Sequence, residues 1–235
     1  MSLFGVPVIY GIKPHETEDV PSHELGALGV DGTGRKYRYV RAGAVALVVG
    51  NLLQSKAENT SDQDLAFAAA AIGATSVTTT TTVTVDANEY ANGYLVVSVT
   101  PDLGRSYRIK SHPAASAGTL VITLYEPLVT AWTTATRADL VANPYADVIV
   151  NPATATSNPV GVAVSAIPIG DYGWIGTGGI FGVLSTGVTA VGQSVVANTA
   201  AGAIIDEAST TRPVVGMAAA GIGSGENGAI FLTID

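Results

Sequence analysis

The chain has 235 residues, which is enough to bury one large hydrophobic core or two smaller ones. Its net charge of −8 argues against a nucleic-acid-binding protein, because such proteins normally carry a basic patch. It contains no cysteine, and this excludes disulfides, thiol nucleophiles and thiolate metal sites.

Charged residues make up only 13% of the chain, about half of the usual ~25%, while 47% of the residues are hydrophobic. A protein this poor in charge is expected to cover part of its surface with other chains, and a homo-oligomer is one way to do so. An ordinary β-sandwich rich in glycine and alanine would have the same composition. No apolar run approaches the roughly 18–20 residues that span a bilayer, so we expect no membrane partner.

Residues 1–25 are predicted to form an extended arm. Pro7, Pro14 and Pro21 recur every seven residues, and each favours extended backbone before it. Apolar side chains alternate along the arm, as in a strand laid on a sheet: Phe4, Val6, Val8, Tyr10 and Ile12. Docking on another subunit and covering its own domain both fit this pattern. The first residues lack the basic segment and long apolar core of a signal peptide, so we expect synthesis in a cytoplasm without export by the general route.

Residues 26–55 are predicted to begin a β domain. Gly29–Gly34 looks like a phosphate-binding loop, but Arg35 replaces the lysine and a strand follows instead of a helix. The pair Asp31-Gly32 instead indicates a hairpin turn. The next segment, Tyr37–Val49, is rich in tyrosine and valine and is expected to form strands.

Residues 56–144 are predicted to form a second β module inserted into the first domain. Ser61–Asp64 has the form of a capping box with Asp in place of Glu, which favours a helix over residues 65–72. A loop that leads into a strand is the alternative for this segment. Residues 76–85 are β-branched almost throughout and suit either a strand or a low-complexity linker. A helical turn is expected at residues 138–142. Three further strands are predicted to form an antiparallel meander, at residues 94–100, 106–110 and 119–125.

Residues 145–235 complete the first domain and hold its most strongly patterned stretch. Tyr172–Leu184 follows Val160–Gly170, and the two are predicted to pair as strands around a turn at Gly170-Asp171. Tyr172–Leu184 also repeats the spacing of aromatic, β-branched and glycine residues in Tyr37–Val49. Both segments are therefore expected to be partner halves of one small barrel or sandwich. Short strands are expected at residues 193–196, 203–205, 213–217 and 229–234.

The predicted fold class is all-β with at most two short helices. A small barrel or sandwich is built from the N- and C-terminal strands, residues 26–55 plus 145–235. The inserted module, residues 56–144, interrupts it.

Residue types that carry chemistry are few and show no catalytic spacing. His15, His23 and His112 match no helical metal-binding pattern, and no G-x-S-x-G segment is present. Paired carboxylates for glycoside hydrolysis are not excluded by spacing, because such partners meet only in the fold. Tyr172 and Trp174 could stack on a sugar, but their alternate strand positions favour packing or interface anchors. We therefore predict no catalytic residues, no cofactor, no metal site and no enzyme.

The segment from Val160 to Gly179, with its GVA and GDYGWIGTGG runs, resembles capsid decoration (cement) proteins and minor head proteins of tailed bacteriophages. The closing segment Pro213–Ala218 (PVVGMA), the early strands Tyr37–Leu53 and the lead-in His23–Gly26 are similar to theirs as well. The resemblance covers about the first quarter and the last third of the chain.

The resemblance implies a structural virion protein that binds the outside of the major capsid protein shell, often as a trimer, and reinforces it. It would be made in the host cytoplasm and reside on the capsid exterior, without nucleic acid or membrane as partner. The first alternative is a tail, collar or fibre component of a virion, and the second is a carbohydrate-binding β module or glycan-active enzyme. We predict that deleting residues 1–20 weakens assembly but leaves the β body folded. The candidate interaction residues are Phe4, Val6, Val8, Tyr10, His23, Tyr172 and Trp174.

Overall fold

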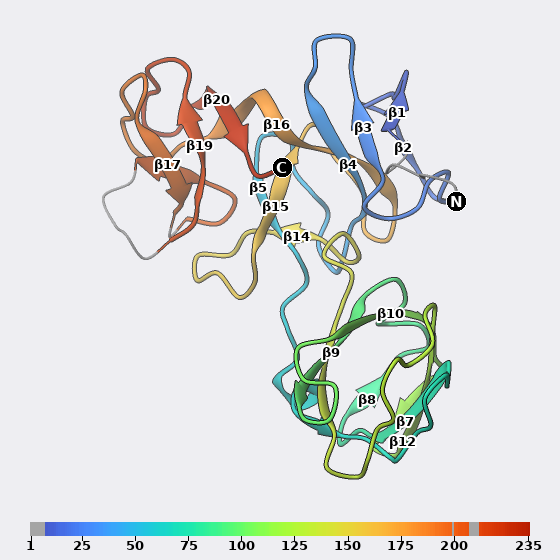
Figure 1. The fold of residues 1–235 in the computed structure, drawn as a ribbon. Coiled ribbons are helices and arrows are strands. Elements are labelled where there is room, and N and C mark those ends of the chain that lie inside the picture. The colour runs from blue at the N-terminus through green and yellow to red at the C-terminus, as the bar shows by residue number, and fades with distance from the viewer. Residues whose placement is uncertain (1–7, 199, 207–211) are drawn as a thin grey trace. The chain divides into compact units, whose positions relative to one another are not determined.

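The computed structural model describes residues 8–198, 200–206 and 212–235. The fold is all-β, as predicted, and Figure 1 shows strands throughout the chain. The chain divides into two compact units. Unit 1 comprises Met1–Ala57 and Pro144–Asp235, and unit 2 comprises Glu58–Asn143. The boundaries expected from the sequence lie within one to two residues of these.

Within its described residues, unit 1 forms one twelve-stranded sheet in which most neighbours are antiparallel. Its main path runs β1-β3-β4-β16-β20-β19-β17-β18, and β2, β5, β14 and β15 attach beside it. The strands are β1 (Val8–Tyr10), β2 (Thr17–Glu18), β3 (Leu28–Val30), β4 (Lys36–Arg41), β5 (Leu52–Gln54), β14 (Ile149–Val150), β15 (Pro159–Ala163), β16 (Tyr172–Leu184), β17 (Ser194–Ala197), β18 (Ile204–Asp206), β19 (Val214–Ala218) and β20 (Asn227–Thr233).

Strand β16 is the element on which unit 1 is built. Its first half pairs with β4, with Trp174 opposite Tyr39, and its second half pairs with β20. The two similar tyrosine segments are therefore hydrogen-bonded neighbours in one sheet. The predicted pairing with the preceding strand is also present, through Val162 opposite Gly176. That preceding strand, β15, ends at Ala163 and does not continue to the predicted turn. Between its end and the turn, Ile167 forms an isolated bridge with Leu47 instead.

The described part of the predicted arm, residues 8–25, is folded onto unit 1. Strand β1 pairs in parallel with β3, and β2 pairs with β16. Ile9 and Ile12 pack against the buried core. At Gly29 in β3 an added Cβ would lie 2.7 Å from the Trp174 ring and 2.9 Å from Ile12, so glycine lets the strand fit between them. The sequence allowed the arm either to dock on another subunit or to cover its own domain. Residues 8–25 cover their own domain.

The glycine-rich segment at Gly29–Gly34 is a hairpin between β3 and β4, as the turn signal predicted. Asp31 holds the turn, because its carboxylate accepts hydrogen bonds from the Thr33 backbone at 2.8 Å and from Arg35 Nε at 2.8 Å. Burial raises the pKa of Asp31, but hydrogen bonds from Thr33 and Arg35 outweigh burial and hold that pKa well below its ordinary value. The loop therefore binds its own aspartate, and no phosphate site is formed there.

Unit 2 is an antiparallel barrel-like sheet in the order β6-β13-β9-β10-β12-β7, and the predicted meander forms its centre. A bridge from Phe67 to Thr79 links the two outer strands and nearly closes the sheet. Alternate residues point inward and form one core that includes Leu95, Ile109 and Leu140. The elements are η1 (Thr60–Asp62), β6 (Leu65–Ala66), β7 (Ser76–Thr80), β8 (Thr84–Val85), β9 (Tyr94–Val99), β10 (Ser106–Ser111), β11 (Ala115–Ser116), β12 (Thr119–Leu124) and β13 (Arg137–Val141).

The predicted helix over residues 65–72 is wrong. Of the capping-box residues, Ser61 and Asp62 belong to the short 3-10 turn η1, and the chain is extended after it, with Leu65 and Phe67 buried. Asp62 does not cap a helix. It is buried, and its carboxylate accepts a hydrogen bond from the Tyr90 hydroxyl at 2.6 Å. A helix of eight residues is marginal alone, whereas extended backbone here pairs with both β13 and β7.

The predicted helical turn at residues 138–142 is also wrong. These residues belong to β13, where Ala138 and Leu140 are buried and pair with β9. Residues 76–85, for which strand and linker were both compatible, form β7 and β8. In both segments, hydrogen-bonded pairing with neighbouring strands of the barrel decides the structure, because the local sequence has only a weak preference for one conformation.

Candidate interaction surfaces

Four aromatic rings lie together where β4 and β16 pair. Residues 8–25, which we call the N-terminal segment, run beside them. Tyr39 lies 5.3 Å from Trp174 and 5.3 Å from His23, measured between ring centroids, and it stacks on Tyr172 at 6.0 Å. His23 also lies 5.3 Å from Trp174. The backbone register places Trp174 opposite Tyr39, so pairing of the two strands creates this cluster.

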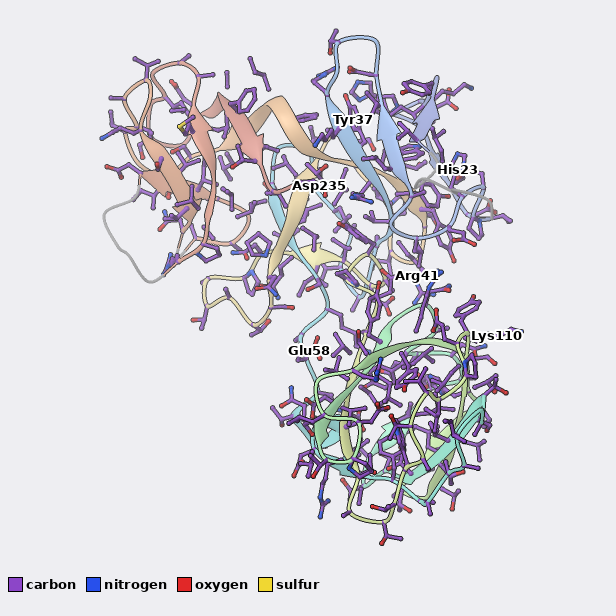
Figure 2. The ribbon with its side chains drawn as sticks, viewed as in Figure 1. His23, Tyr37, Arg41, Glu58, Lys110 and Asp235 are labelled. Carbon is purple, nitrogen blue, oxygen red and sulfur yellow. The ribbon has the colours of Figure 1, made fainter. Side chains whose placement is uncertain are left out.

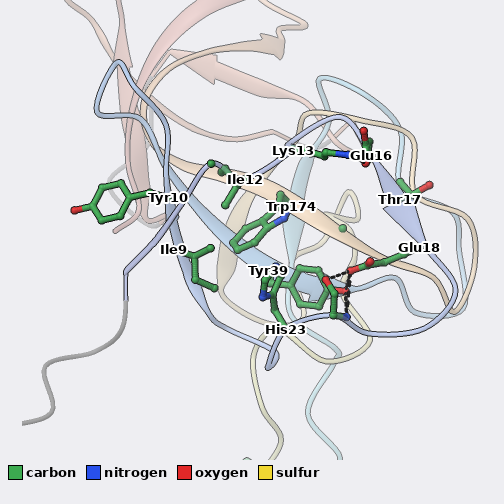
Figure 3. A pocket seen from close by; sticks show the side chains of 13 residues that line it. Ile9, Tyr10, Ile12, Lys13, Glu16, Thr17, Glu18, His23, Tyr39 and Trp174 are labelled. Atoms are coloured by element: carbon green, nitrogen blue, oxygen red, sulfur yellow. Dashed lines mark hydrogen bonds and ion pairs between the residues drawn. The ribbon is translucent and has the colours of Figure 1, made fainter.

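The carboxylate of Glu18 lies at the edge of this aromatic cluster. Glu18 accepts hydrogen bonds from the Ser22 hydroxyl at 2.5 Å and from the Tyr39 hydroxyl (Figure 3). Hydrogen bonds from Ser22 and then Tyr39 lower the pKa of Glu18, while burial and the bond to Glu18 raise the pKa of Tyr39 to about 12. A general acid or base needs a pKa near the working pH. At neutral pH, Glu18 stays ionised and Tyr39 stays protonated, so this pair fastens the N-terminal segment and is poorly suited to proton transfer.

A hollow of about 270 Å³ lies over this cluster and is lined by the N-terminal segment. Figure 3 shows Trp174 facing Ile12 and Tyr39, whereas the ring of Tyr10 points away from them. Trp174 is only 4% exposed. A ring buried to that extent offers no open face on which a sugar could stack, so this cluster does not suit the carbohydrate alternative.

The structure places the seven candidate interaction residues in different environments, or leaves them undescribed. His23, Tyr172 and Trp174 are brought together, as packing anchors of unit 1. Val8 is half-buried in β1, and Tyr10 is 75% exposed. The remaining two, Phe4 and Val6, lie outside the described residues.

A second surface, which the sequence did not reveal, lies on the solvent face of the same sheet. Ile180 of β16 is directly opposite Phe231 of β20, and Phe231 is directly opposite Met217 of β19. These three side chains are 51%, 46% and 47% exposed. We call them the apolar row. Their chain neighbours Phe181 and Ile230 point to the buried face, so the alternation of the strands leaves the row outside.

Ile180, at one end of the apolar row, borders two hollows. One, of about 530 Å³, is lined by Ile180, Phe231 and the β3–β4 hairpin residues Arg35 and Lys36. The other, of about 340 Å³, also includes Ile180 and Arg35, together with Val49. Large exposed apolar side chains that lie together mark surfaces that contact other molecules.

No signal in the sequence alone identified the apolar row. In the sequence, Ile180, Met217 and Phe231 belong to three separate predicted strands. Their alignment depends on the register between β16, β20 and β19, which is set by pairing over long sequence distances.

Across residues 8–198, 200–206 and 212–235, no three histidine, aspartate or glutamate side chains lie close enough together to hold a metal ion. No helix in that part of the chain is long and apolar enough to cross a membrane.

Comparison of the chain with protein families, with curated proteins and with solved structures gave no match.

Proposed function

We propose that the chain is a structural virion protein that binds the outside of a tailed-bacteriophage capsid shell and stabilises it, without catalysis. The sequence resemblance of Val160–Gly179 and Pro213–Ala218 to decoration proteins supplies the class. The observation that carries the proposal is the apolar row, because Ile180 and Met217 stand in or beside these same segments.

The size of the apolar row fits a contact that is repeated many times. A stable interface between two free proteins buries about 800 Å² on each partner, which is more than three side chains supply. On a symmetric shell, many weak contacts act together, and a trimer multiplies each of them. The major capsid protein is therefore the proposed partner, with Phe231 at the centre of the contact.

The test uses shells assembled from the major capsid protein of the virus that encodes the chain, prepared without the chain. Full-length protein is expected to co-sediment with these shells in a saturable way. The double variant Phe231→Ser, Met217→Ser should bind at least about tenfold more weakly, because it removes two of the three apolar side chains. Small-angle X-ray scattering should show a compact particle of three chains.

The matched control is Leu103→Ser, which removes a large apolar side chain that is 61% exposed on unit 2. It should bind shells like the unchanged protein, and circular dichroism should show that all variants are folded. Absence of co-sedimentation, or equal binding by the double variant, would contradict the proposal. A long rod in solution would instead indicate a fibre or tail component.

A further inference from the structure

Unit 2 carries a row of three large side chains on the outer face of its barrel. Arg108 of β10 is directly opposite Tyr94 of β9. On its other side, the backbone N–H of Tyr125, which follows β12, donates to the Arg108 carbonyl at 3.0 Å. Residues opposite one another in neighbouring strands project from the same face. We call these three residues the Tyr–Arg–Tyr row.

The core of unit 2 does not require the two tyrosines of this row. Tyr90 and Tyr107 are 3% and 4% exposed, and their hydroxyls donate to buried carboxylates within unit 2. Tyr94 and Tyr125, in contrast, are 45% and 46% exposed. Two large aromatic rings therefore face solvent on either side of β10, in an otherwise normally alternating barrel.

Hydrogen bonds hold part of the row in place before any ligand arrives. The Arg108 guanidinium lies 4.8 Å from the centroid of the Tyr125 ring. Arg108 Nη2 and the Tyr125 hydroxyl both donate to Asn92 Oδ1, at 3.1 and 3.0 Å. Asn92 is itself tied to the barrel, because its backbone N–H donates to Ile109 at 2.9 Å. A surface ordered in this way loses little conformational entropy on binding.

Positively charged side chains stand at the row although the chain is acidic overall. Arg108 and the exposed Lys110 stand on the same strand, and Figure 2 shows Lys110 at the surface of unit 2. The carboxylate of Glu126 accepts a hydrogen bond from the Arg108 backbone at 3.1 Å. The carboxylate of Asp139 lies further along the sheet, where it accepts the backbone N–H of Asp64 at 2.6 Å. Arg108 and Lys110 therefore place two positive side chains at the row, in a chain with a net charge of −8.

We propose that the Tyr–Arg–Tyr row binds an acidic polysaccharide through a carboxylated sugar. Neighbouring strands lie about 4.8 Å apart, so the two tyrosines are roughly 10 Å apart, a span comparable with two linked sugar rings. The C–H faces of a sugar ring pack on exposed tyrosine surface, as in other aromatic contacts with apolar groups. Arg108 and Lys110 pair with the carboxylate. The site is independent of the proposed capsid contact, which lies on unit 1.

The experiment measures binding of the full-length chain to immobilised polygalacturonate and to the same polymer after methyl esterification, which removes its charge. Binding to polygalacturonate is expected, with at least about tenfold weaker binding to the ester. Tyr94→Thr and Tyr125→Thr should each weaken binding about tenfold, because each removes a stacking surface while keeping a residue suited to strands. Arg108→Gln should abolish the preference for the acidic polymer.

Two matched controls separate a binding site from a structural role or general charge. Val121→Ala alters another side chain, 40% exposed, on the outer face of β12, and Arg137→Gln removes one positive charge elsewhere on unit 2. Both should bind like the unchanged chain, and melting curves should show all variants folded. The proposal is overturned if polygalacturonate does not bind, if both polymers bind equally, or if the folded tyrosine variants bind as well as the controls.

Discussion

At the scale of single residues, the apolar row depends on close contact between the backbones of β19 and β20. A Cβ added at Gly216 would lie 2.3 Å from the carbonyl oxygen of Phe231, and a backbone atom in a paired strand has little freedom to move away. Gly216→Ala should therefore lower the free energy of unfolding of unit 1 by about 1–3 kcal/mol, as overpacking of a filled site does. Thermal or denaturant unfolding measures this loss.

The control for Gly216 is Gly182→Ala in β16, where an added Cβ has no neighbour within 4 Å and the backbone is not in the left-handed region. That change should alter the stability by no more than about 0.5 kcal/mol. If both variants were equally stable, the close approach at Gly216 would not be limiting. Gly216→Ala should also weaken binding to capsid shells, because it shifts Phe231 relative to Met217.

At the scale of elements, the N-terminal segment is part of the folded body of unit 1, which changes the expectation for its removal. Deleting residues 1–20 removes Ile9 and Ile12, which pack against the core, and Glu18, which accepts a hydrogen bond from Tyr39. Unit 1 should lose about 2–4 kcal/mol, because full burial of an isoleucine contributes about 1.5–3 kcal/mol and these two are partly buried. In a Trp132→Phe background, Trp174 is the only tryptophan, and its emission should shift to the red as it becomes exposed.

The single variant Tyr10→Ser is the companion to this deletion, since Tyr10 is exposed and contributes little to the core. It should leave stability and Trp174 emission unchanged. A truncated protein as stable as the full chain would show that the segment is an independent arm, as the proline pattern had suggested.

Elements with a clear local pattern could be predicted from the sequence, and elements that depend on pairing with distant strands could not. Alternation of apolar residues located β9, β10 and β12, and glycine with aspartate located the β3–β4 turn. Residues 65–72 were mistaken for a helix because alanine-rich segments suit both states, and pairing with β7 and β13 decides between them. The surfaces were less predictable: burial of Trp174 and exposure of Phe231 follow from strand register, which local sequence does not specify.

At the scale of the whole molecule, the chain is two β units joined by two crossings, at residues 57–58 and 143–144. Each unit has its own hydrophobic core. In unit 1, Gln54 pairs with Ile149, so the chain ends left by removing unit 2 lie close enough for a short linker. In unit 2, Leu65 pairs with Ala138, which brings its two ends near each other. An insertion with neighbouring ends can fold by itself.

We therefore predict that residues 58–143 fold alone, and that unit 1 folds when a short glycine-serine linker replaces them. Circular dichroism and cooperative melting of each piece measure this. The linked unit 1 should keep binding to capsid shells, and isolated unit 2 should keep binding to polygalacturonate, because the apolar row and the Tyr–Arg–Tyr row lie on different units. If either piece fails to fold while the full chain melts in one transition, the units depend on each other for stability. If both fold but each activity requires the full chain, each surface needs residues from both units, and the assignment of one surface to each unit is wrong.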